Sequence, residues 1–402
     1  KKIKMLTLII IIVKSIPSII STAFEHYIHG APQPSWNLKV HLSVKFRQLV
    51  SSTSSFKIEE LQGMSSKVFP KLPSDMEKID IIIPNEYRVD AQAYIEKLIK
   101  PYSIAIDPIW KTPKDNGING ELIMDKNWDD KNDWAKEKIV IYFHGGAYIG
   151  GNRSMSREFC SELTRISGAR ILSIGYRLAP QQPFPSALCD ALATYLYLTN
   201  PPDDSGFKPY SPKQIVVGGE SSGGGLSVSL GLALRDLGLP LPAGIFGWGS
   251  WLDLTHSMPS FSDPDMDKTD VLTRSLGFFI AQDPKSAAYK DFRSRTKNII
   301  EDIRQHPEIK IIGDESLKRI GNESTAVYVV NEGFGIPYVS PMLAESLGGL
   351  PPMLIAAGNG ERMRDESIYL SYRAANPEKY RLPKYEIDFD NSKFKTPTKV
   401  TL

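Results

Sequence analysis

The sequence contains little cysteine and little net charge. Only two of its 402 residues are cysteines, Cys160 and Cys189, and neither lies in a Cys-x-x-Cys pair or a Cys/His cluster. This spacing excludes a zinc-ligand motif and a disulfide framework, so we expect two buried thiols. The formal net charge is +2, and no strong basic field is present that would gather nucleic acid. Small molecules of low charge are the favoured partners.

The sequence also lacks an apolar run long enough to span a bilayer. The run 5–13 has nine residues, follows three lysines and ends at Lys14, whereas a spanning helix needs about 20 residues. A basic stretch before a short apolar one is typical of a shallow anchor or a signal peptide, and a terminal helix of the folded chain is the alternative. We expect residues 1–23 to form an apolar N-terminal segment. Residues 5–20 of it would associate with a membrane, at the endoplasmic reticulum or along the secretory route.

Residues 111–402 contain a regular alternation of apolar and helical segments. Continuous apolar runs, typical of strands buried on both faces, occur at 138–143, 169–174, 214–217, 244–248 and 353–357. Helical stretches lie between them at 157–166, 187–198 and 224–237. The alternation predicts an α/β fold with a mostly parallel central sheet and helices on both faces.

Two regions depart from this alternation. Residues 24–110 mix aromatic residues, apolar residues and prolines without a chemical motif, and we expect an N-terminal helical or cap region there. From 256 to 335 the sequence is charged, has a helical patch at 298–305 and shows no strand rhythm. A cap insertion near the strand ends is the natural interpretation, and its role would be gating and substrate shape.

The strongest chemical signal is the segment Gly219-Glu220-Ser221-Ser222-Gly223, which follows the predicted strand 214–217 and precedes a helix. A tight strand-to-helix turn presents a serine hydroxyl at the top of the sheet. The helix N-terminus directs unpaired N–H groups toward developing negative charge. We therefore expect Ser221 to be a nucleophile. A structural glycine-rich turn is the alternative.

A second signal is the segment 144–147, which ends the predicted strand 138–143. Acyl transfer develops an oxyanion, and two successive glycines let main-chain N–H groups come close enough to stabilise it. We expect His144 to hold this loop by hydrogen bonds rather than to transfer protons. The expected oxyanion-hole donors are the N–H groups of Gly145, Gly146, Ala147 and Ser222.

These motifs, in this order, resemble the hormone-sensitive-lipase-like branch of the α/β-hydrolase fold esterases and lipases. The likeness rests on His144-Gly145-Gly146, on 219–224, and on Tyr176-Arg177-Leu178-Ala179-Pro180 between them. Val339-Ser340-Pro341 and Leu350-Pro351-Pro352 also lie where that branch has similar sequence. The resemblance covers roughly residues 138–402. The long insertion and the apolar N-terminus look most like fungal steryl-acetate hydrolase-type members.

The resemblance implies a catalytic acid in a Gly-x-x-Glu or Gly-x-x-Asp turn after the strand that follows the cap. Here that turn is Gly358-Asn359-Gly360-Glu361. Glu361 would orient a histidine and stabilise its protonated form. Asp365, a few residues further on, is the alternative acid.

The resemblance also implies a histidine base, in a loop after the next strand, but no histidine follows Glu361. Because 399–402 looks like the start of that strand, we expect the catalytic histidine beyond Leu402. His256, just past a strand end, is the alternative base. The six histidines of the chain are His26, His29, His41, His144, His256 and His306.

The favoured function is a carboxylic ester hydrolase that acts through an acyl-enzyme on a small, apolar ester. This chemistry needs neither a metal nor an organic cofactor. One alternative is a non-catalytic protein that binds a small molecule, because plant gibberellin receptors resemble the same branch and lack the histidine. A second is a hydrolase-like scaffold for protein contacts, which no feature of the sequence favours.

Overall fold

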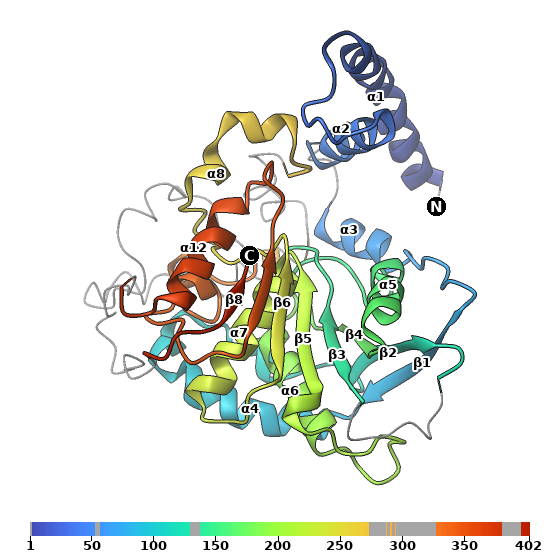
Figure 1. The fold of residues 1–402 in the computed structure, drawn as a ribbon. Coiled ribbons are helices and arrows are strands. Elements are labelled where there is room, and N and C mark those ends of the chain that lie inside the picture. Colours follow the sequence, from blue (N-terminus) through green and yellow to red (C-terminus); the bar gives the residue numbers. More distant parts are fainter. Residues whose placement is uncertain are drawn as a thin grey trace.

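One eight-stranded sheet runs through the molecule (Figure 1), in the order β1-β2-β4-β3-β5-β6-β7-β8. The computed structural model describes residues 2–52, 57–128, 137–272, 327–379 and 395–402, and the single residues 287, 290, 291 and 294. β2 pairs antiparallel with β1 and β4, and the other neighbours pair in parallel. The strands are β1 Met76–Ile83, β2 Ile118–Asp125, β3 Ile139–Phe143, β4 Arg170–Gly175, β5 Ile215–Glu220, β6 Gly244–Trp248, β7 Met353–Ala356 and β8 Val400–Thr401.

Helices cover both faces of this sheet. Buried side chains of α4, α6, α7 and α12 share one apolar cluster with Ile141 of β3, whereas Cys160 of α5 packs with Tyr142 in a second cluster. Because successive residues of β3 face opposite clusters, the strand reads as a continuous apolar run. The helices are α1 Lys2–His29, α2 Leu38–Ser52, α3 Ile58–Ser65, α4 Asn85–Ile99, α5 Arg157–Ser167, α6 Ser186–Thr199, α7 Ser222–Asp236, α8 Pro259–Ser262 and α12 Arg364–Ala375.

The N-terminal helices α1 and α2 pack against each other beyond one end of the sheet (Figure 1). The side-chain amide of Gln48 in α2 donates hydrogen bonds to the main-chain oxygens of Asp267, at 2.9 Å, and Asp270, at 2.6 Å. These bonds attach the helix pair to the segment that follows α8. Across the described ranges, no helix has the length and the apolar character that crossing a membrane requires.

The predicted α/β fold is confirmed, and β3 to β7 and α5 to α7 lie within one or two residues of the predicted segments, apart from β5, which ends three residues later than predicted. Both cysteines are buried and unbridged, as expected. The region 24–110 was expected to be helical or cap-like, but it also contains β1, an edge strand of the sheet. Its half-exposed, charged sequence hides the strand pattern. The helical patch predicted at 298–305 lies outside the described residues.

Candidate active site

Ser221 lies in a strained turn between β5 and α7. Its φ of +52° and ψ of −122° are sparsely populated for a residue with a side chain. The turn is fixed by main-chain hydrogen bonds, since Ser221 N donates to Trp248 O at 2.9 Å and Trp251 N donates to Ser221 O at 2.9 Å. The predicted strand-to-helix bend is therefore present, and main-chain bonds with Trp248, the last residue of β6, and with Trp251 hold it.

Gly223 lets α7 begin directly against β3. A methyl group on Gly223 would lie 1.9 Å from the main-chain oxygen of Phe143. No side chain fits in that space, so only glycine lets the first turn of α7 approach the strand this closely. This close approach places Ser221 beside the loop that follows Phe143.

That loop brings the predicted oxyanion donors to the serine. A methyl group on Gly145 would lie 3.2 Å from Cβ of Ser221, so the two main chains are neighbours. The main chain then reverses through Gly146 and Ala147, which have φ values of 127° and 54°. Ser222 begins α7 and is buried, and the N–H groups of a first helical turn have no intrahelical acceptor. The structure thus places Gly145 and Ser222 beside Ser221, and Gly146 and Ala147 follow Gly145 in the same loop.

His144 is buried inside this loop. Its Nδ1 lies 2.7 Å from Gly145 O, and its ring stacks on Tyr176 with centroids 4.4 Å apart. Burial lowers the pKa of His144 to about 4, so the ring is neutral at physiological pH. This placement suits the loop-structuring role predicted from the sequence.

Tyr176 is a contributor that the sequence analysis did not single out. Its hydroxyl donates to His144 O at 2.8 Å, so it supports the loop through the main chain as well as by stacking. The residue lies just after β4 in the segment 176–180 that carried the family resemblance. A sequence pattern alone cannot distinguish such a tyrosine from one that only fills the core.

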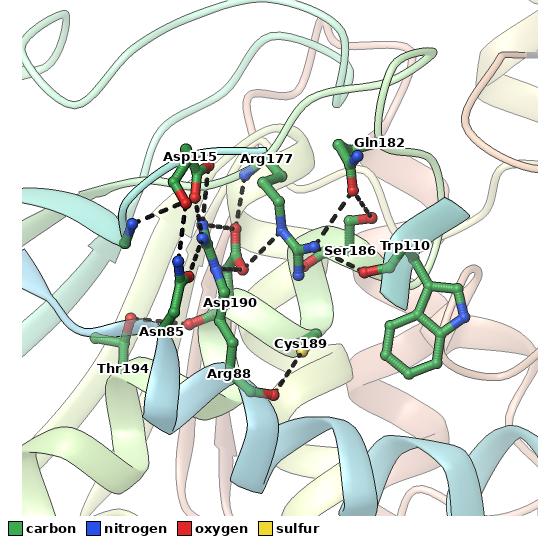
Figure 2. A network of polar contacts seen from close by, with 11 residues as sticks. Asn85, Arg88, Trp110, Asp115, Arg177, Gln182, Ser186, Cys189, Asp190 and Thr194 are labelled. Atoms are coloured by element: carbon green, nitrogen blue, oxygen red, sulfur yellow. Dashed lines mark hydrogen bonds and ion pairs between the residues drawn. The ribbon is translucent and has the colours of Figure 1, made fainter. Parts of the chain in front are cut away.

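A buried ion-pair network holds the segment that contains Tyr176 (Figure 2). The carboxylate of Asp190 in α6 accepts hydrogen bonds from Nε of Arg177 at 2.9 Å and from Nε of Arg88 in α4 at 2.8 Å. Arg88 also pairs with Asp115, and Arg177 donates to Trp110 O at 2.8 Å. Because each buried charge has partners, the network avoids the penalty of an unpaired ion. It fixes Arg177, and therefore Tyr176 next to it.

Glu361 lies at the same end of the sheet as Ser221. A methyl group on Gly249, which follows β6, would lie 3.1 Å from Oε2 of Glu361. Trp248, the residue before Gly249, accepts a hydrogen bond from Ser221 N. The end of β6 therefore lies between the predicted nucleophile and the predicted acid. Burial raises the pKa of Glu361, and the Asp270 carboxylate raises it further, against a main-chain hydrogen bond with Gly358.

The alternative acid, Asp365, is engaged elsewhere. Its Oδ2 accepts from Ser260 N at 2.9 Å and its Oδ1 from Nε of Arg364 at 2.8 Å, so it fastens α12 to α8. Glu366 is a buried carboxyl that the sequence analysis did not assign, and it accepts from Leu252 N at 2.8 Å. Burial raises the pKa of Glu366 well above its usual value. Both carboxyl groups are thus bonded to donors of other segments, whereas the Glu361 carboxyl lies beside Gly249 at the end of β6.

His256, the alternative base, lies in an aromatic stack. Its ring is parallel to Phe261, with centroids 3.7 Å apart, and its Nε2 accepts from Nε1 of Trp251 at 3.1 Å. Burial lowers the pKa of His256 to about 3. Nε2 is therefore directed at an indole rather than at the Ser221 hydroxyl. His306 lies outside the described residues, and His26, His29 and His41 belong to α1 and α2.

Comparisons with known proteins agree with this architecture. A family model described as alpha/beta hydrolase fold matches residues 140–316. An acetyl-hydrolase of Streptomyces hygroscopicus is 31% identical over 153 residues, 37% of this chain and 49% of that protein. The carboxylic ester hydrolase LipN of Mycobacterium tuberculosis is 28% identical over 233 residues, 57% of this chain and 50% of that protein. The chain thus spans about half the length of these two relatives.

Solved structures share the fold at low sequence identity. An esterase/lipase from an uncultured bacterium has a TM-score of 0.55 at 22% identity, over 89% of this chain and 86% of that one. An esterase of the bacterial hormone-sensitive lipase family has a TM-score of 0.53 at 22% identity, over 85% and 84%. The chain is therefore an α/β-hydrolase fold protein that resembles the hormone-sensitive-lipase-like branch of this fold.

Proposed function

We propose that this protein is a carboxylic ester hydrolase with Ser221 as its nucleophile. The observation that carries the proposal is the positive-φ turn at Ser221 with Gly145 packed against it. A serine held in such a bend beside turned main-chain segments matches what acyl transfer requires. The names of the relatives, an acetyl-hydrolase and a carboxylic ester hydrolase, support the same chemistry.

In the proposed reaction, Oγ of Ser221 attacks the ester carbonyl carbon while a histidine accepts the hydroxyl proton. The carbonyl oxygen becomes an oxyanion, which N–H groups of the loop 145–147 and of Ser222 stabilise. The histidine then gives its proton to the departing alcohol, and an acyl-enzyme remains. Water, activated by the same histidine, releases the acid and restores the serine.

Glu361 is the proposed partner of that histidine. Burial and Asp270 raise the pKa of Glu361, and no cation of the described residues is among the causes of this shift. A histidine that becomes protonated beside Glu361 would provide such a cation and stabilise the carboxylate. Neither His144 nor His256 directs a ring nitrogen at Ser221 through any of the bonds described above. His306 lies outside the described residues, and the proposed base is neither His144 nor His256.

Aromatic side chains near the serine support a small, apolar ester as the substrate. Tyr148 of the oxyanion loop stacks on Tyr328 with centroids 3.9 Å apart. The ring centroids of Tyr148 and Trp251 are 6.3 Å apart, and the main-chain N–H of Trp251 donates to Ser221 O. Both tyrosines are buried, so they make the surroundings of the loop apolar, and apolar surroundings would favour an apolar ester over a charged one.

Replacement of Ser221 by Ala tests the proposal. Relative to the wild-type protein, Ser221→Ala should lower the turnover of a short-chain p-nitrophenyl ester by about a thousand-fold or more. Ser229→Ala, a buried serine further along α7, is the matched control and should keep wild-type turnover. Equal turnover in the Ser221 variant and the wild type would contradict the assignment.

A non-catalytic small-molecule-binding protein is the second candidate, and the orientation of His256 toward Trp251 favours it. A protein of this kind would bind an apolar ligand and release no product. Equilibrium dialysis of the uncleaved ester, run beside the turnover assay, separates the two functions. Saturable binding of the ester without product in the wild-type protein would favour the binder.

A further inference from the structure

The helix α1 exposes a continuous apolar stripe. Its members recur every three or four residues, as one face of a helix requires. Phe24 and Tyr27 are 63% and 77% exposed. In water a stripe of this length is unfavourable, and a contiguous exposed apolar surface of this kind marks an interaction site. The stripe consists of Val13, Ile16, Ile20, Phe24 and Tyr27.

The opposite face of α1, which packs on α2, is polar. Ser15 and Thr22 are buried there, and Nδ1 of His26 lies 3.3 Å from Nδ1 of His41 in α2. In a helix pair that stands free in water, apolar side chains turn inward and polar ones outward. The described part of α1 has the reverse arrangement, so a second, apolar environment must face the stripe.

The charge of this region indicates which environment that is. Residues 2–52 contain six lysines and arginines and one acidic residue, Glu25. The whole chain has 48 basic and 46 acidic residues, so the remainder carries more acids than bases. An apolar helix face within a basic segment is complementary to an anionic lipid surface, where both contributions favour binding.

We propose that α1 docks flat on an anionic bilayer surface through the stripe of Val13, Ile16, Ile20, Phe24 and Tyr27. The helix lies in the interface and does not cross the membrane, which agrees with the lack of a spanning helix within the described residues. The stripe side chains enter the boundary between headgroups and acyl chains. The basic side chains of the segment attract the anionic headgroups.

This docking orients the rest of the molecule. α1 and α2 lie beyond the end of the sheet that holds Ser221 (Figure 1). Gln33, between these helices, has its side chain 3.2 Å from where a methyl group on Gly360 would lie. The docked pair would therefore turn the Ser221 end of the sheet toward the bilayer. The binding itself does not depend on the proposed function. Delivery of an apolar ester from the lipid does depend on it.

Flotation of the whole chain with lipid vesicles tests the inference. The wild type should float with vesicles of phosphatidylcholine and phosphatidylserine, should float less with phosphatidylcholine alone, and should be released by added salt. The double variant Ile20→Glu/Phe24→Glu should reduce vesicle binding by about ten-fold or more. Ile166→Glu, at an isoleucine of α5 that is more exposed than Ile20, is the control and should bind as the wild type does.

Three results would overturn the inference. In the first, the wild type does not float with either kind of vesicle. In the second, the double variant binds vesicles as well as the wild type does. In the third, sedimentation without lipid shows a dimer that the double variant loses while neither protein binds vesicles, which would assign the stripe to a second copy of the chain. Circular dichroism checks the fold of the variant, and if it is unfolded, the lipid and salt dependence of the wild type decides.

Discussion

The hydroxyl of Tyr176 joins two segments that are far apart in the sequence. It bonds the main-chain oxygen of His144 while its ring lies on the His144 ring. A single atom thus supports the loop whose N–H groups are proposed to stabilise the oxyanion. Small displacements of such donors are costly in catalysis, because the donors must already point at the charge that develops.

Tyr176→Phe should therefore lower kcat by about ten-fold and leave KM nearly unchanged, since one hydrogen bond is lost and the stacking remains. Ester turnover across substrate concentrations measures both constants. Tyr195→Phe removes a similar bond, from a tyrosine hydroxyl to Pro240 O at 2.8 Å, and serves as the control. A parallel loss of kcat in both variants would contradict the positioning role.

His256 makes a different prediction, which concerns pH. Burial lowers its pKa to about 3, so in acid the unfolded chain binds a proton that the folded chain excludes. The free energy of unfolding should fall as pH decreases below 6.5, by about 1.4 kcal/mol per pH unit for this residue. His256→Asn, which tolerates the φ of 52° at this position, removes this contribution.

Urea unfolding of both proteins from neutral pH down to about pH 5 measures the effect as a difference, so other titrating groups cancel. The stability gap between wild type and variant should narrow as pH falls. A gap that stays constant with pH would show that His256 is not the proton-excluding group.

Sequence reasoning selected Ser221, Gly145 and Glu361 as candidates because each lies in a short motif with a local reason for its residues. The structure brings these residues to one end of the sheet. Tyr176 and Glu366 were missed, because their partners, His144 and Leu252, are 32 and 114 residues away and no local pattern records the contact. Roles that depend on long-range hydrogen bonds require the structure.

At the scale of elements, α7 and β3 meet more closely than ordinary helix packing allows. The contact depends on Gly223, where a methyl group would lie 1.9 Å from Phe143 O. Gly223→Ala should lower the free energy of unfolding by about 3 kcal/mol, the upper end for an overpacked site. Gly63→Ala in α3 has no atom within 4 Å of the new methyl group and should instead stabilise the protein by about 0.5–1 kcal/mol.

Denaturant titration of the two variants measures both effects. Equal stability of the two glycine variants would show that the close approach at Gly223 can relax.

The parallel strands were predictable because burial on both faces leaves a continuous apolar run. β1 was not, because Glu77, Lys78 and Asp80 interrupt the apolar residues of this edge strand.

At the scale of the whole molecule, Asp190 connects parts of the chain that the sequence places far apart. Its carboxylate accepts hydrogen bonds from Arg88 of α4 and from Arg177 of the segment after β4 (Figure 2). Asp190→Asn would leave two buried guanidinium groups without their shared carboxylate. The free energy of unfolding should therefore fall by about 3–5 kcal/mol.

Chemical denaturation of Asp190→Asn measures this loss. Asp265→Asn is the control, because Asp265 pairs with Lys268 on an exposed surface, and its stability should match the wild type within error. A similar small change in both variants would contradict the importance assigned to burial. The sequence offered no indication of this network, because its members are separated by up to 102 residues.

The two hydrogen bonds from Gln48 have a consequence for motion. The segment they hold also contains Thr269, whose hydroxyl donates to Gly360 O at 2.6 Å, and Asp270, whose carboxylate accepts from Arg362 N at 2.6 Å. Glu361 lies between those two main-chain positions. If α2 is displaced, either the hydrogen bonds of the Gln48 amide break or the turn 358–361, which contains Glu361, moves with the helix. The outermost helices and the carboxylate proposed for catalysis are thereby mechanically linked.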